Sequence, residues 1–199
     1  MSDLLTSWGY TIENTDTLPD LMTVAEFDSL TGNKFAGDAR VPQLLASAQI
    51  AVRNFCGWHL YPSLPCKFEA DSINVSRCIQ LPSRFVSGVG SLTLNGEAVL
   101  DYHVKTNGLV FLDGSVLGKS WNDVVVEFSS GLGDSQIGAL KEILAGRIAN
   151  ALTNSYGVQS ESAGGVSITY SLNWASNASA SSITDPLIAA LAPYKVQEV

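Results

Sequence analysis

The sequence predicts an α+β fold: a small helical core of about four helices, an inserted antiparallel β-rich region, and an extended C-terminal tail. Three observations predict it. Apolar residues recur at helical spacing in residues 43–55 and 137–156. Between residues 58 and 131 the apolar spacing becomes two, with turn signals between the segments. From residue 157 to 182 small and polar residues dominate the chain.

These changes of pattern divide the 199 residues into parts. The first part is a polar stretch without a convincing period, which we interpret as an arm that orders only against another structure. We expect the two long helices to pack together, with the β-rich region inserted between them in sequence. The parts are an N-terminal arm (1–20), a helical core (21–58 and 134–157), a β-rich region (59–133) and a tail with a short terminal helix (158–199).

The first two helices carry recognisable end signals. Thr23 and Glu26 have the spacing of a capping box, in which each side chain binds the other residue's backbone amide. Gly32 then ends this short helix. Pro42 suits the first turn of a second helix, and Gly57 suits the left-handed position just beyond its last turn.

The third helix spans residues 136–156, with Asp134 or Ser135 as N-cap and Gly157 as its stop. Small residues occupy the flank away from its large apolar side chains. A glycine inside a helix costs roughly 1 kcal/mol relative to alanine, so close approach by another helix is expected there. That helix belongs either to the same chain or to a neighbouring subunit. The candidates for a subunit contact are Ala145, Gly146 and Ala149.

Two Asn-Gly pairs predict hairpins in the β-rich region, because Asn-Gly accepts the positive φ angles of a type I′ turn. Asn95-Gly96 joins residues 91–94 to 99–100. Asn107-Gly108 joins residues 102–105 to 109–112. Further strands are expected at residues 67–70, 73–80 and 124–128.

Composition excludes several classes of protein. The net charge is −8, and no cluster of lysine and arginine is present, which argues against a nucleic-acid-binding surface. No apolar run approaches the roughly 20 residues that span a bilayer, so no membrane partner is expected. The first ten residues lack the pattern of a signal peptide. The three cysteines are expected to be reduced and mostly buried.

Residues capable of chemistry are few and scattered. Cys56, His59, Cys66 and Cys78 are possible zinc ligands, but the usual paired spacing is absent, and Cys78 falls where a strand would bury it. The only other histidine, His103, adjoins no nucleophile motif and is expected on a strand surface. We therefore expect no catalytic residue, no metal and no cofactor.

Six segments carry a resemblance to a known family when they are taken in order. They are the first short helix (22–32), the exit of the second helix (Val52-Arg-Asn-Phe-Cys-Gly-Trp58), the β-rich block from Leu81-Pro82 to Gly131, the long helix (136–156), the segment 157–167 and the closing helix (187–195). No single motif is diagnostic, but the ordered set covers nearly the whole chain. It resembles the head–tail connector (adaptor) proteins of tailed bacteriophages.

This resemblance implies a structural virion protein at the head–tail junction, assembled in the host cytoplasm. Connectors form a ring, twelve-fold in the virion, between the portal protein and a downstream stopper or tail-completion protein. DNA passes through their channel without sequence-specific binding, and the free chain is expected to be a monomer. The C-terminal segments of such proteins reach into the portal. The corresponding partner-binding candidates are Val158, Ser160, Glu161, Gly164, Val166, Ile168 and Tyr170.

Two alternatives remain open at this level. One is another head-completion or tail structural protein, such as a stopper or a tail terminator. The other is a small metal-binding or enzymatic module.

Overall fold

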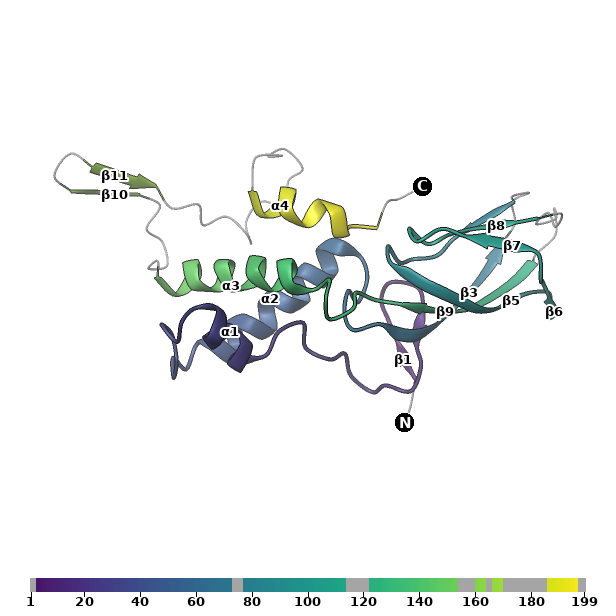
Figure 1. The fold of residues 1–199 in the computed structure, drawn as a ribbon, viewed down its shortest axis with the longest axis horizontal. Helices are drawn as coiled ribbons and strands as arrows, with labels where there is room; N and C mark the ends of the chain where they lie inside the picture. The colour runs from purple at the N-terminus through teal and green to yellow at the C-terminus, as the bar shows by residue number, and fades with distance from the viewer. Residues whose placement is uncertain are drawn as a thin grey trace. The chain divides into compact units, whose positions relative to one another are not determined.

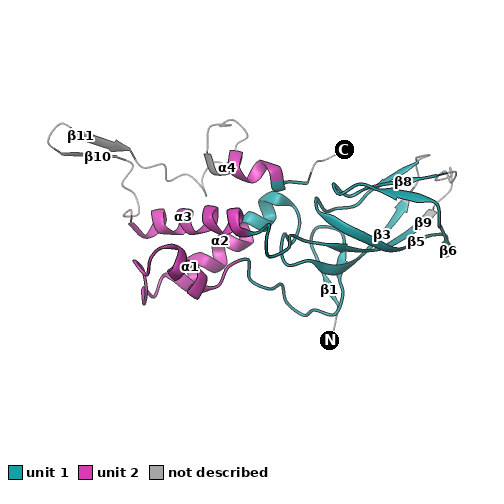
Figure 2. Ribbon diagram, viewed as in Figure 1, with its two compact units in different colours: residues 1–21, 52–137, 194–199 teal, residues 22–51, 138–193 magenta. Residues whose placement is uncertain are grey.

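A computed structural model describes residues 3–72, 77–113, 122–153, 160–163, 166–169 and 186–196, and it confirms the α+β class (Figure 1). The chain divides into two compact units (Figure 2). The β unit comprises residues 1–21, 52–137 and 194–199, and the helical unit comprises residues 22–51 and 138–193. None of the helices in the described ranges is long and apolar enough to cross a membrane.

The elements are as follows. The helices are α1 (Val24–Leu30), α2 (Val41–Cys56), α3 (Gly138–Thr153) and α4 (Pro186–Leu191), with a short 3-10 helix, η1 (Ala192–Tyr194). The strands are β1 (Leu4–Leu5), β2 (Thr11–Ile12), β3 (Leu64–Ser72), β4 (Cys78–Gln80), β5 (Val86–Leu94), β6 (Glu97–Ala98), β7 (Tyr102–Val104), β8 (Leu109–Leu112), β9 (Asn122–Ser130), β10 (Ser160–Ala163) and β11 (Val166–Thr169).

In the helical unit, the expected capping box opens α1. The Thr23 hydroxyl accepts the Glu26 backbone N–H at 3.3 Å, and the Glu26 carboxylate accepts the Thr23 N–H at 2.8 Å. The second Glu26 oxygen accepts a bond of 2.6 Å from Lys141 Nζ on α3. This bond is the main cause that lowers the pKa of Glu26. The Glu26 carboxylate therefore caps the N-terminal end of α1 and also links α1 to α3.

Helix α3 has neighbours in α1 and α4 within the helical unit. The start of α3 differs from expectation. Helix α3 begins at Gly138, two residues later than expected. Asp134 does not cap it, because its carboxylate accepts the Tyr61 hydroxyl at 2.8 Å. Gly57, with a φ of 78°, ends α2 as expected, whereas Gly157 lies outside the described residues.

The β unit is built on a six-stranded antiparallel sheet of order β1-β2-β3-β9-β5-β6. Strands β3 and β9 pair along nine residues, from Leu64 opposite Ser130 to Ser72 opposite Asn122. A second sheet of order β4-β8-β7 contributes to the same core. The buried residues of this core are Tyr10, Ile12, Cys66, Ile79, Leu81, Val86, Leu92, Val110, Leu112, Val124, Val126 and Phe128.

Both predicted hairpins are present. Asn95 and Gly96 have φ angles of 52° and 78°, which is the combination that a type I′ turn requires. Its second strand is β6, immediately after the turn, rather than residues 99–100. The second hairpin pairs β7 with β8, with Val104 opposite Val110. Gly108 takes the positive φ of that turn, 85°.

The N-terminal segment is not a separate arm. Strand β1 pairs with β2, and β2 pairs with β3, so residues 4–12 extend the large sheet. Tyr10 and Ile12 are 2% and 0% exposed. Burial of these two side chains stabilises the segment on its own chain.

Candidate assembly surfaces

The surface candidates begin with α3, whose two faces differ sharply. Its buried face carries Leu140, Leu144, Ala145, Ile148 and Leu152. Its exposed face carries Gly138, Ala139, Glu142, Gly146, Asn150 and Thr153. The first set recurs at three- and four-residue intervals, which is the expected apolar stripe. Ala145 belongs to this buried set and is 5% exposed, so this chain already covers it.

The glycines of α3 lie on its exposed face. A Cβ atom added to Gly138 or to Gly146 would meet nothing within 4 Å. Ala149 is half-buried beside this face. Close packing within the described chain therefore does not explain either glycine. What remains is a helix face that a second molecule could approach with little side chain in the way.

The second candidate surface lies in the tail, which was expected to be extended. Its described backbone is instead an antiparallel hairpin (Figure 1), in which Ser160 pairs with Thr169 and Ala163 with Val166. Of the tail candidates, Ser160, Glu161, Val166 and Ile168 are in these two strands. The others, Val158, Gly164 and Tyr170, lie outside the described residues.

The hairpin forms a sheet of its own. Strands β10 and β11 pair with each other, and no other strand of the described chain joins them. Each strand therefore keeps an outer edge of backbone N–H and C=O groups that the described chain does not pair. A two-stranded sheet is marginally stable in water, so an added strand would stabilise it.

A buried polar cluster in the β unit was a candidate for chemistry, because it contains His59. The Tyr10 hydroxyl donates to His59 Nδ1 over 2.7 Å. His59 Nε2 lies 2.9 Å from the Ser130 carbonyl oxygen and 3.1 Å from that of Pro62, so this nitrogen carries the ring hydrogen. Burial lowers the pKa of His59 to about 4. Both ring nitrogens are occupied by backbone and tyrosine, which makes this cluster structural.

The thiols give no metal or nucleophile site. Burial raises the pKa of Cys56 and of Cys66 to about 12, so both stay protonated. Cys78, expected in the core, is exposed because it lies on the outer side of the edge strand β4, whose buried residue is Ile79. In the described ranges, no three residues of the His, Cys, Asp and Glu types are placed to hold a metal ion.

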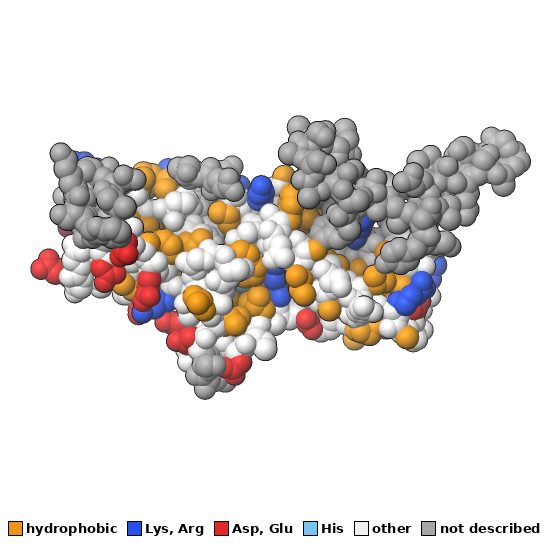
Figure 3. Space-filling model, turned by 180° about the vertical axis from the view of Figure 1, so that it is seen from behind, with side chains coloured by type: hydrophobic (Ala, Val, Ile, Leu, Met, Phe, Trp, Pro, Cys, Tyr) orange, Lys and Arg blue, Asp and Glu red, His pale blue; other side chains and the backbone are white. Residues whose placement is uncertain are grey.

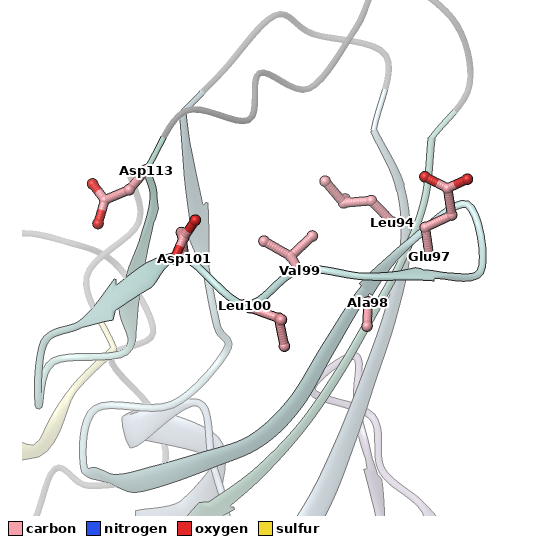
Figure 4. Close-up of a pocket in the computed structure, with 7 residues that line it drawn as sticks. All are labelled: Leu94, Glu97, Ala98, Val99, Leu100, Asp101 and Asp113. Carbon is pink, nitrogen blue, oxygen red and sulfur yellow. The ribbon is translucent and has the colours of Figure 1, made fainter.

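A surface hollow near β6 also offers few reactive side chains (Figure 4). Asp113, on its rim, pairs with His103 Nε2 at 2.9 Å, and both side chains are exposed. The lining has no basic, thiol or hydroxyl side chain of its own that could act with its carboxylates. It consists of Leu94, Glu97, Ala98, Val99, Leu100, Asp101 and Asp113.

Charge on the large sheet is mostly negative on its outer side. Asp71 of β3 lies directly opposite Asp123 of β9, and Glu127 accepts a hydrogen bond of 2.9 Å from Ser91. Glu69 and Lys67 form an ion pair on the same side. The face seen in Figure 3 shows lysine and arginine in small separate groups rather than as one basic surface. This side of the sheet therefore lacks the cluster of basic residues that is typical of nucleic-acid binding.

Comparison with known proteins finds no family model and no curated protein sequence that matches. Two solved structures share the fold. One is a chain from the neck of a native gene transfer agent (GTA) particle computed with C12 symmetry; the TM-score is 0.51 at 15% identity, over 92% of this chain and 97% of that chain. The other is from the neck of an empty GTA particle computed with C6 symmetry, with a TM-score of 0.56 at 18% identity, over 94% of this chain and 96% of that chain. This chain therefore has the fold of particle-neck proteins along nearly its whole length.

Proposed function

We propose that this protein is a structural component of the head–tail neck of a phage-like particle. More specifically, it is the connector that forms a ring under the portal, extends the DNA channel and joins the head to the tail. The observation that carries this proposal is the shared fold with neck proteins, which covers more than nine-tenths of both chains in two particle states.

The exposed face of α3 supports assembly into a ring. A cyclic ring needs a heterologous contact, in which one face of each subunit meets a different face of the next. Gly146 leaves room for close backbone approach, and Ala149 adds a small neighbour nearly one turn further along. We propose that these two residues contact the adjacent subunit. A helix or loop of that subunit would then bury the face without displacing a large side chain.

Acidity supports passage of DNA. The chain has 19 acidic and 11 basic residues, and the carboxylates of Asp71 and Asp123 face each other across two strands of the large sheet. Like charges directly opposite each other on neighbouring strands destabilise the sheet. Their presence here favours a function for negative charge on this face that offsets the loss of stability. A neck whose surface repels phosphate lets DNA cross without adhering.

The partner-binding segment of this proposal is the hairpin with its flanks, residues 158–170. Successive residues of each strand lie on alternate faces, so each face of the hairpin can present residues to a partner. We propose that this segment binds the portal, and that the remaining exposed surface of the ring serves the stopper or tail-completion protein.

A binding experiment with the purified portal tests the proposal. Truncation after Tyr156 is unsuitable, because the C-terminal residues support the β unit. Trp58 Nε1 donates to the Tyr194 carbonyl oxygen at 2.6 Å, and the Val196 N–H donates to the Cys56 carbonyl oxygen at 2.9 Å. Residues 158–170 are therefore replaced by a Gly/Ser linker of equal length, and residues 173–182 are replaced likewise as the matched control.

The wild-type chain and the control should form rings on the portal that electron microscopy detects, and the 158–170 variant should not. All three should show the same thermal unfolding, since the buried core of the β unit is built from other residues. Undiminished binding by the 158–170 variant would show that the hairpin does not contribute to portal binding. A wild-type chain that forms no complex with portal would refute the neck assignment itself.

A further inference from the structure

The hairpin has two open edges with little of the usual protection against pairing. Native edge strands are blunted by proline, charged side chains (lysine above all), short length, bulges or a covering element. Strands β10 and β11 contain neither proline nor lysine, and Glu161 is their single charged residue. Their register runs through four consecutive residue pairs without a bulge. No strand of the described chain covers either outer edge.

The intrinsic strand preference of β10 is weak, whereas β11 reads Val-Ser-Ile-Thr and favours a strand. Strand β10 reads Ser-Glu-Ser-Ala, which contains no β-branched or aromatic residue. A two-stranded sheet of this composition is marginal by itself, and a third strand on either edge would supply the missing backbone hydrogen bonds. The edges are therefore better suited to pairing between molecules than to remaining exposed.

We propose that β10 of one chain pairs with β11 of the next, so that a ring of chains carries a continuous collar of antiparallel strands. This inference rests on the proposed neck function, and it names the second copy of this chain as the occupant of each edge. The two edges are different, and in a ring related by rotation β11 of each copy runs antiparallel to β10 of its neighbour. That is the arrangement the hairpin already has internally, and it is a heterologous contact that can close.

A collar of this kind would enclose a channel. The neck of the native particle was computed with C12 symmetry. Twelve hairpins, at two strands each and about 4.8 Å per strand, close a circle about 115 Å round and roughly 37 Å across. The edges are then used between copies, whereas the two faces of each hairpin remain free to contact the portal. Self-pairing and portal binding by this segment are thus compatible.

Backbone geometry identifies the amides to test. In antiparallel pairs, hydrogen-bonded and non-hydrogen-bonded positions alternate. The pair next to a two-residue turn, here Ala163 and Val166, is hydrogen-bonded, so the N–H groups of Ser162 and Ser167 point away from the hairpin. Ser162→Pro therefore blocks the β10 edge, and Ser167→Pro blocks the β11 edge, without removing an internal bond. Ser162→Ala and Ser167→Ala keep the N–H and serve as matched controls.

Assembly of the full chain is measured by analytical ultracentrifugation over a concentration series, and on the portal by electron microscopy. The wild type and both alanine variants should form rings, and each proline variant alone should assemble at least tenfold more weakly. An equal mixture of the two proline variants should form dimers but no rings, because one intact β11 edge then meets one intact β10 edge. Normal rings from either proline variant would overturn the proposal.

Hydrogen exchange gives a readout that needs no substitution. In the wild-type ring the amides of Ser162 and Ser167 should exchange at least tenfold more slowly than in the monomer, and equal exchange in both states would overturn the proposal. The proposed function fails separately, when the wild-type chain does not bind the portal. Rings on the portal with unprotected Ser162 and Ser167 amides would leave the neck role intact and exclude the collar.

Discussion

The hydroxyl of Tyr10 forms two hydrogen bonds with His59 in the β unit, one with its imidazole and one with its backbone amide. The hydroxyl donates to Nδ1 over 2.7 Å, and its oxygen accepts the backbone N–H of His59 at 3.1 Å. Arg53 completes the arrangement by donating from Nε to the His59 carbonyl oxygen at 3.0 Å. The N-terminal segment, the end of α2 and the turn after it are therefore joined through one histidine.

Removal of the Tyr10 hydroxyl should destabilise the protein. Tyr10→Phe leaves a buried ring nitrogen and a buried amide without partners, at a cost of about 1–3 kcal/mol in the free energy of unfolding. Tyr61→Phe is the matched control, because the Tyr61 hydroxyl bonds to Asp134 at the exposed surface. Urea denaturation at pH 7 measures both variants. Equal losses of stability would show that the buried Tyr10 bonds contribute no more to stability than the exposed Tyr61 bond.

The free energy of unfolding should fall as the pH is lowered from about 6.5 to about 4. The unfolded chain protonates His59 near its ordinary pKa of about 6.5, whereas the folded chain holds that pKa at about 4. Within this window the unfolded state binds the proton and the folded state does not, so His59 contributes stability above pH 6.5 that is lost on acidification. The full loss is about 3 kcal/mol.

Urea denaturation at several pH values measures this loss, and NMR titration of the His103→Gln variant assigns it. His59 is then the sole histidine, and its ring should stay neutral to about pH 4. A midpoint near 6.5 in the folded protein would contradict the burial of this side chain.

Gly131 should tolerate no side chain. Its φ is 138°, and a Cβ atom there would overlap the carbonyl group of Pro62 and Cα of Ser63. Gly131→Ala should cost about 2–5 kcal/mol, since backbone strain and steric overlap add. Gly133→Ala is the control, because its Cβ would make only ordinary contact at 3.8 Å with Gln136 Oε1. Thermal unfolding of both variants checks the difference, and similar melting temperatures would argue against it.

Substitutions of Gly146 should separate effects on the stability of the monomer from effects on ring assembly. Gly146→Ala should raise the free energy of unfolding by about 0.5–1 kcal/mol, because alanine favours the helix and its Cβ meets nothing in the chain. Gly146→Leu should also leave the monomer folded but should block ring formation, measured by electron microscopy on the portal. Gly138→Ala, at the start of α3, is a control for changes on the same face. Normal rings from Gly146→Leu would show that this part of α3 contacts no neighbour.

Local signals in the sequence predicted the elements that depend on neighbouring residues. The capping box of Thr23 and Glu26, the stop at Gly57 and the turn at Asn95-Gly96 are each decided within a few positions of the chain, and each is present. The alternation of Val124, Val126 and Phe128 likewise identified β9, because one face of that strand is buried.

Features that depend on distant partners were missed. Strands β1 and β2 have two residues each, too few to show a period, and their place in the sheet depends on β3, more than fifty residues later. The bond between Lys141 and Glu26 has no sequence signal, since it joins two helices. Strand β10 was missed because its Ser-Glu-Ser-Ala sequence has no strand preference, whereas Val166 and Ile168 of β11 have the two-residue spacing of a strand.

The anchoring of the C-terminal residues bears on the conformational entropy of the connection between α3 and α4. Tyr194 and Val196 are held by Trp58 and Cys56, and α4 lies against α3, so the chain that leaves α3 is anchored again at α4 and at its C-terminal residues. Closing a connection between two anchored ends costs entropy that grows only with the logarithm of its length, about 0.6 kcal/mol per doubling. The length of the connection from α3 to α4 is therefore inexpensive to change in free energy.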